Sequence, residues 1–231
     1  MSKFDWDKFF DDWKKEYKIN VFAKDGIICQ EKYENILFIL KDVNNCTVED
    51  NPDLRISLVT RTDEGKTWFN VCRWIVALLD GVPYNDYVDK MNSDKQHEII
   101  RKAAVVNIKK EAGGSSVSDE VIKCYAKKHR EKLIEQIEIC TPNIIVVCGV
   151  NIFDAALDVL GDMTPFTTER PEFNMAKNWA IGTVKVKGKD VPIVQFRHPS
   201  NRCSAEKSYN DMLLIREYID KNMPSNKSLN N

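Results

Sequence analysis

The sequence predicts an α/β protein, a three-layer α/β/α sandwich with a central, mainly parallel sheet. Short, continuous apolar runs recur along the chain, as expected for parallel strands that are buried on both faces. Segments with helical spacing of apolar residues separate these runs, and polar residues follow where each run ends. Because 43% of the 231 residues are hydrophobic, one domain over residues 1–223 can bury a proper core, followed by a flexible polar tail over residues 224–231.

The first expected element is an amphipathic helix within residues 1–20. Aromatic residues recur at helical spacing between Phe4 and Tyr17, so one face of this helix is expected to pack on the domain. The same segment alternates aromatic and charged residues and lacks the apolar centre of a signal peptide, which predicts a cytoplasmic protein. The apolar runs are too short to cross a bilayer, so we expect no membrane partner.

Strands and helices then alternate. The first buried strand is Ile36–Leu40, and after an irregular polar stretch over residues 45–65 the apolar spacing predicts a helix over Thr67–Leu79. The second strand, Ala103–Val106, leads through glycines and serines to a long helix over residues 118–139. The first turn of that helix is acidic, which suits the positive end of a helix dipole.

Four more elements complete the predicted order, namely a third strand, a helix, a hairpin and a last helix. They occupy, in that order, Ile144–Cys148, Asn151–Leu160, residues 179–196 and Ser204–Asn222. Gly149 marks the turn after the third strand, and a Lys-Gly-Lys-Asp turn joins the two strands of the hairpin. The result is a regular alternation of strands and helices, as a parallel sheet requires.

Charge and cysteine content narrow the possible functions. Lys and Arg total 34 against 35 Asp and Glu, a formal net charge of −1, so contact with nucleic acid would need a local basic surface. The seven cysteines form no Cys-x-x-Cys clip, which predicts reduced thiols and neither a metal nor an iron–sulfur cluster. No glycine-rich phosphate loop of the Walker or dinucleotide type is found, so we expect no organic cofactor.

Polar groups follow three of the predicted strands, in the segments 41–44, 107–110 and 197–200. Ligands of open α/β sheets bind at the carboxyl edge, where such segments meet. An acid, an amide and a histidine are therefore expected to converge there.

This order of motifs resembles the uracil-DNA glycosylase superfamily. Its members have an apolar strand ending in an acidic or amide-bearing loop, a middle strand ending in Asn, a strand ending in Gly and a late His-Pro-Ser loop before the last helix. The counterparts here are Leu40–Asn44, Val105–Asn107, Val147–Gly149 and His198–Ser200, and the resemblance spans about residues 33–220. His-Pro-Ser is the most specific match, whereas the first loop lacks both the Gly and the Pro of the family.

The resemblance implies a monofunctional DNA glycosylase, which hydrolyses the N-glycosidic bond of a flipped-out uracil or modified pyrimidine. Such an enzyme would serve base-excision repair or defence against modified phage DNA. Excision passes through an oxocarbenium-like sugar, so Asp42 would orient water and stabilise the positive charge, while His198 would stabilise the departing base anion.

The remaining candidate residues would hold the DNA, which is the expected partner of a monomeric protein. Amides can read the Watson–Crick edge of a flipped base, and an aromatic ring can stack on it. The base-binding candidates are Asn44, Phe69 and Asn107. The phosphate-binding candidates are Ser200, Asn201 and Arg202.

Structural alternatives stand beside these roles. Asp42 could cap a turn, and His198 could be a turn histidine. Asn107 could cap a strand end, and Phe69 could belong to the core. A different chemistry is also open, because Lys41 lies close enough to act as a Schiff-base nucleophile. For the whole protein, the alternatives are a non-catalytic nucleic-acid or protein binding module of the same fold and a nucleotide or nucleoside hydrolase.

Overall fold

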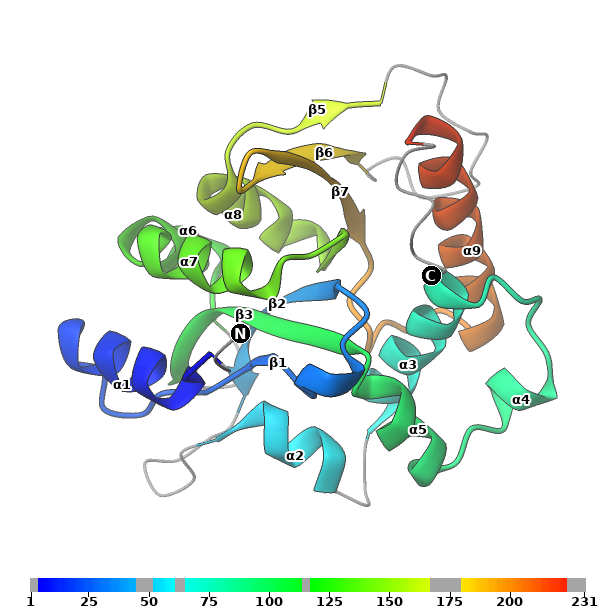
Figure 1. Cartoon of the computed structure of the whole chain (residues 1–231), viewed down its shortest axis with the longest axis horizontal. Coiled ribbons are helices and arrows are strands. Elements are labelled where there is room, and N and C mark those ends of the chain that lie inside the picture. The colour runs from blue at the N-terminus through cyan, green and yellow to red at the C-terminus, as the bar shows by residue number, and fades with distance from the viewer. Residues whose placement is uncertain (1–3, 45–51, 61–64, 114–116, 167–179, 224–231) are drawn as a thin grey trace.

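A central sheet organises the computed structural model, which describes residues 4–44, 52–60, 65–113, 117–166 and 180–223. Within these residues the sheet has seven strands in the order β1-β3-β2-β4-β7-β6-β5 (Figure 1). The strands are β1 (Gly26–Ile27), β2 (Ile36–Asn44), β3 (Ala103–Gly113), β4 (Ile144–Cys148), β5 (Thr164–Pro165), β6 (Ile181–Val186) and β7 (Lys189–Phe196). The central strands β3, β2, β4 and β7 are parallel, and the others add antiparallel at the two edges.

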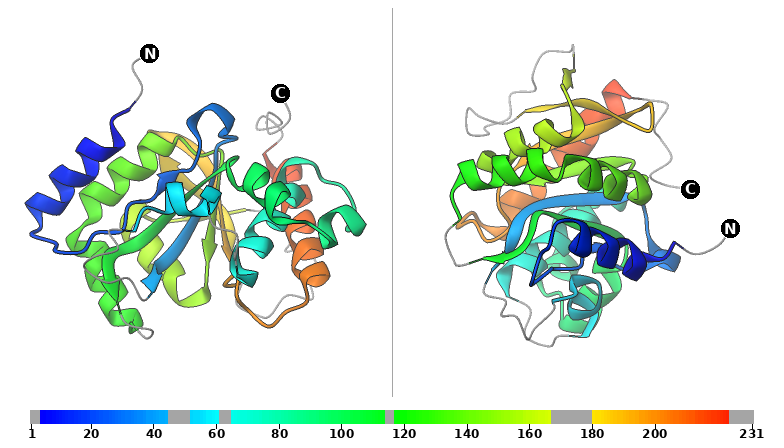
Figure 2. Two further views of the ribbon diagram at one scale, coloured as in Figure 1. Left: turned by 90° about the horizontal axis from the view of Figure 1, so that it is seen from below. Right: turned by 90° about the vertical axis from the view of Figure 1, so that its left-hand side faces the viewer.

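Helices cover both faces of this sheet (Figure 2). One face carries α1 (Trp6–Glu16), α6 (Asp119–Lys128), α7 (Arg130–Cys140) and α8 (Val150–Leu160). The opposite face carries α2 (Leu54–Thr60), α3 (Lys66–Leu79), α5 (Ser93–Ile100) and α9 (Ala205–Asn222), and the short α4 (Asp86–Asp89) follows α3. The predicted three-layer α/β fold with a parallel centre is thus confirmed. None of the described helices is both long and apolar enough to cross a membrane.

Strand β2 shows how the sequence pattern produces the layers. Leu37 and Ile39 pack in the core under α7 and α8, whereas Ile36, Phe38 and Leu40 pack in the core under α3 and α9. This alternation follows from the period of two along a strand, and it leaves no solvent face in the middle of the sheet.

The helix predicted over residues 118–139 is divided into α6 and α7 at His129, and this prediction was wrong. His129 has φ −105° and ψ 17°, which interrupts the helix. Its buried ring stacks on Tyr125 at 3.9 Å between centroids, and its Nδ1 accepts a hydrogen bond from Trp13 Nε1 at 3.0 Å. Burial lowers the pKa of His129 to about 4, so the ring is neutral and can accept. The break between α6 and α7 thus lies where Trp13 of α1 contacts His129. The apolar spacing within residues 118–139 gives no sign of this long-range contact.

Several short elements were not expected from the sequence. The helix α2 lies inside the stretch predicted to be irregular, and Leu58 is the residue that it buries. The two-residue strands β1 and β5 are too short to show a period. The proposed flexible tail, residues 224–231, lies outside the described residues.

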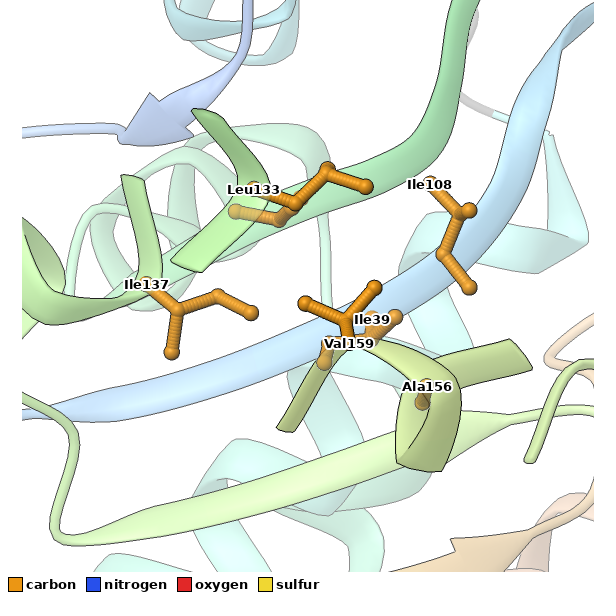
Figure 3. A pocket seen from close by; sticks show the side chains of 7 residues that line it. Ile39, Ile108, Leu133, Ile137, Ala156 and Val159 are labelled. Atoms are coloured by element: carbon orange, nitrogen blue, oxygen red, sulfur yellow. The ribbon is translucent and has the colours of Figure 1, made fainter. Parts of the chain in front are cut away.

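A small apolar cavity lies between the sheet and the helices α7 and α8 (Figure 3). Its lining consists of Ile39, Val106, Ile108, Leu133, Ile137, Ala156 and Val159. These aliphatic side chains offer no hydrogen-bond partner to a polar ligand or to water. The cavity therefore belongs to the packing of this layer.

Candidate functional site

The strand order places a topological switch point between β2 and β4. The chain runs from β2 to its neighbour β3 on one side, whereas β4 leads on to β6 and β7 on the other side. Open α/β sheets bind ligands outside the carboxyl ends of the strands at such a point. Here β2 carries Asp42 near its end at Asn44, β4 ends before Gly149, and β7 ends at Phe196, two residues before His198. The polar segments 41–44 and 107–110 therefore lie within β2 and β3, which are longer than predicted, and do not follow them.

Asp42 is the acid at this edge. Its side chain is half-buried, and Oδ2 is buried with no hydrogen-bond partner among the described residues. Burial raises the pKa of Asp42, while the positive charges of Lys109 and Lys41, and that of His198 when its ring is protonated, act in the opposite direction. The predicted acid and histidine are therefore within electrostatic reach of each other, and Oδ2 is a buried acceptor without a hydrogen-bond partner among the described residues.

His198 follows β7 and remains exposed at one side. Its Nδ1 accepts the backbone N–H of Ser200 at 3.2 Å and lies 2.7 Å from Ser200 Oγ. Since a backbone N–H can only donate, Nδ1 carries no proton, and the neutral ring must carry its proton on Nε2. Partial burial of the ring and the charge of Lys41 lower the pKa of His198, and Asp42 opposes this shift. The loop thus offers a neutral N–H donor at Nε2.

Two lysines flank the Asp42 carboxylate, one on each strand. Lys109 pairs with Asp42 in the register of β3 and β2, and its Nζ donates to the carbonyl oxygen of Glu111 at 2.6 Å. Lys41 Nζ donates to the carbonyl oxygen of Val117. Lys109 thus binds the backbone of β3 itself, whereas Lys41 binds the connection between β3 and α6. The contact of Lys41 with Val117 weighs against Lys41 as a Schiff-base nucleophile.

Asn107 does not present its amide donor at this site. The side chain is buried, and its Nδ2 donates to Asp25 Oδ2 at 3.1 Å. The same carboxylate oxygen accepts the backbone N–H of Asn107 at 2.8 Å. The prediction that Asn107 reads a base through this donor needs correction, because Nδ2 already donates to the buried carboxylate of Asp25.

The other two base-binding candidates differ in what the structure says of them. Phe69 is half-buried and packs against the core on the α3 side, with the guanidinium carbon of Arg73 5.9 Å from its ring centre. This placement favours the structural alternative for Phe69. The side chain of Asn44 lies outside the described part of the structure.

The phosphate-binding candidates lie on the loop between β7 and α9. Ser200, Asn201 and Arg202 are exposed. Asn201 also shapes the loop, since its backbone N–H donates to the His198 carbonyl at 2.9 Å and its Oδ1 accepts from the Cys203 N–H at 3.1 Å. These residues stand just before the positive N-terminus of α9, a location that suits an anionic group.

Arg197 also belongs to this segment, but its side chain forms contacts inside the protein. Its guanidinium pairs with the Asp211 carboxylate on α9, and the two side chains are only 12% and 14% exposed. It also contacts the sulfur of Cys203. Arg197 therefore anchors the loop.

Asn70 is a residue of this region that sequence reasoning missed. It lies on α3, is 3% exposed, and its Nδ2 donates to the Pro199 carbonyl at 2.6 Å. The available signal was a single amide within the apolar face of a predicted helix. Buried polar side chains need a partner, so such an amide points to a long-range contact.

Metal ligation finds no support in the described residues. Among them, no group of three His, Cys, Asp or Glu side chains is placed to hold a metal ion. The six cysteines of that part of the chain are free.

Comparison with known proteins leaves the family open. No family model and no curated protein matches the chain. Among solved structures, the chain is similar to a domain of unknown function (DUF1537) from Bordetella bronchiseptica, crystallised as a domain-swapped dimer with bound citrate. The match covers 79% of this chain and 41% of that chain, with 11% identity and a TM-score of 0.33. The chain thus spans less than half of that structure, and the likeness carries no functional argument.

Proposed function

We propose that this protein is a monofunctional DNA glycosylase, which hydrolyses the N-glycosidic bond of a flipped-out uracil or modified pyrimidine. The observation that supports the proposal best is the placement of Asp42 near the end of β2 and of His198 just after β7, within electrostatic reach of each other. The resemblance of the motifs around these two residues to uracil-DNA glycosylases points in the same direction. In this proposal the protein acts on DNA as a monomer in the cytoplasm, in base-excision repair or in defence against modified phage DNA.

The proposed reaction breaks the bond between the sugar C1′ and the base nitrogen. The bonding electrons leave with the base, and the Nε2–H of His198 donates to the negative charge that develops on the base. The Asp42 carboxylate stabilises the positive charge on the sugar and orients a water molecule toward C1′. The water oxygen bonds to C1′, and the proton that it loses balances the protonation of the departing base anion.

The electrostatics of the edge suit these two roles. Burial disfavours the charge on Asp42, but Lys109 and Lys41 favour it, so the carboxylate can be ionised at neutral pH. His198 is held as a neutral donor, since its pKa is lowered and its Nδ1 accepts from Ser200. A neutral histidine needs no proton uptake before it can donate from Nε2.

The experiment that tests the proposal is the detection of free bases by mass spectrometry. The substrates are single- and double-stranded DNAs with uracil, deaminated purines or hypermodified pyrimidines, together with the free nucleosides and nucleotides. Release of one base from DNA by the wild type, and its loss in the Asp42→Asn variant, is the expected result. Release from free nucleosides alone would point to a small-molecule hydrolase, and no release from any substrate would favour a binding module.

The rate of base release should rise with pH along a single limb and then level off. The active form has an ionised Asp42, whose pKa lies above 3.8, and a neutral His198, whose pKa lies below 6.5. Lowering the pH through the range of about 6.5 to 4 should protonate both groups and remove activity. A pH–rate profile at saturating substrate provides the measurement.

The His198→Gln variant is the matched control for this profile, because the glutamine amide keeps a neutral donor but does not titrate. The rise in rate with pH in this variant should therefore reflect the ionisation of Asp42 alone. A rate that falls as the pH rises from 5 to 8 would instead require a protonated His198 and would contradict the assignment of a neutral donor.

A further inference from the structure

Hydrogen bonds from two side chains of α3 fix the loop that carries His198. The buried Asn70 donates from Nδ2 to the Pro199 carbonyl at 2.6 Å. Its Oδ1 accepts from Arg73 Nη1 at 3.2 Å. With Arg73 on one side and the carbonyl on the other, the amide has one orientation that satisfies both partners.

Arg73 is in turn fixed by backbone carbonyls beyond its own helix. Its Nε donates to the Val88 carbonyl at 3.2 Å, and its Nη2 donates to the Asp89 carbonyl at 3.0 Å. The guanidinium also lies over the ring of Phe69 at 5.9 Å. The relay therefore connects the α4 segment, through two side chains of α3, to the residue that follows His198.

Pro199 itself is buried, so its carbonyl depends on this amide. On the surface side of the same loop, the Ser200 N–H fixes the ring of His198 through Nδ1. The two contacts involve consecutive residues, the carbonyl of Pro199 and the N–H of Ser200.

We propose that Asn70, oriented by Arg73, is a positioning residue that keeps the His-Pro-Ser loop at the carboxyl edge so that Nε2 of His198 faces the substrate. This inference rests on the proposed function for its catalytic consequence. Asn70 acts through the loop and has no assigned contact with substrate. A displacement of about 1 Å at a catalytic group can cost about 100-fold in rate, so one buried hydrogen bond can matter for catalysis.

The test compares Asn70→Leu, which keeps the size of the side chain but removes the donor, with Asn92→Ala as the control. Asn92 caps α5 by accepting the Lys95 N–H at 3.0 Å, so its loss affects stability without touching the His198 loop. If Asn70→Leu does not fold, Asn70→Ala replaces it. The readouts are kcat and KM for base release and the NMR titration of the His198 ring.

In Asn70→Leu we expect kcat to fall about 10- to 100-fold and KM to change less than about threefold. The titration midpoint of His198 should rise toward the ordinary value of about 6.5, since a released ring is better solvated while Lys41 and Asp42 remain in place. Asn92→Ala should show neither change. A folded variant at Asn70 whose His198 midpoint equals that of the wild type would overturn the proposal, whatever its rate.

The failure of the proposed function can be told apart from the failure of this inference. If the wild type releases no base, the proposed function fails, and the NMR titration still decides whether Asn70 holds the loop. If the wild type releases a base and the Asn70 variants titrate and react as the wild type does, the positioning role alone is wrong.

Discussion

Replacing Asp42 by asparagine should reduce kcat for base release by about 100- to 10,000-fold, the range typical for loss of a positioned acid–base group. Asparagine has the same shape but no negative charge, so it cannot stabilise the cationic sugar or accept a proton from water. The measurement is steady-state base release at varied concentrations of the substrate identified in the panel. Since shape is preserved, KM should change much less than kcat.

The same substitution should leave the folded state as stable as before or slightly more stable. Burial raises the pKa of Asp42, which means that the folded protein disfavours the ionised carboxylate relative to the unfolded chain. That penalty is present at neutral pH and disappears as the pH falls and the group is protonated. Functional groups often destabilise the folded state. A variant that loses activity but keeps its stability would therefore support a catalytic role for Asp42.

Asp190→Asn is the control for this experiment. Asp190 forms an exposed ion pair with Lys185 at 2.9 Å on the hairpin of β6 and β7, away from the carboxyl edge. Its replacement should change neither rate nor stability appreciably. If Asp42→Asn keeps a rate within tenfold of the wild type, the acid has a structural role, and the proposed mechanism is wrong.

The layers of the fold could be predicted because each depends on a local pattern. The runs Ile36–Leu40, Ala103–Val106 and Ile144–Cys148 are apolar at every position, which occurs where a strand is covered on both faces. Asp42 and His198 could be predicted for a similar reason, since each lies close to the carboxyl end of an apolar strand. That they lie at the same edge follows from the parallel direction of β2, β4 and β7, but the order of these strands could not be read from the sequence.

What could not be predicted depends on partners far away in the chain. The carboxylate of Asp25 that binds Asn107 lies 82 residues earlier, beside a strand of two residues that has no detectable pattern. The carbonyl that Asn70 binds lies 129 residues later. The sequence shows that a buried amide needs a partner, but it does not show which group supplies it.

The largest stability effect should come from the buried ion pair between Lys110 and Asp25. Both side chains are 0% exposed, and Lys110 Nζ lies 2.5 Å from Asp25 Oδ1. Asp25 also accepts from Gln136 Nε2 at 2.8 Å and from the backbone N–H of Asn107 at 2.8 Å. Burial lowers the pKa of Lys110, and the Asp25 carboxylate opposes this shift. The charge on each partner is therefore tolerated because of the other.

Lys110→Met should lower the free energy of unfolding by about 3–5 kcal/mol, because it leaves an uncompensated carboxylate in the core. Urea denaturation at neutral pH measures the change. Lys185→Met removes the lysine of a pair of similar length, 2.9 Å, whose side chains are 65% and 52% exposed. That control should cost less than about 1 kcal/mol, since water already screens the pair.

A double variant distinguishes an unpaired charge from a simple loss of packing. Asp25→Asn combined with Lys110→Met should recover a large part of the loss, because the double variant buries no charge. If the double variant is no more stable than the single one, the lysine contributes through its methylene groups and the ion pair does not stabilise the fold.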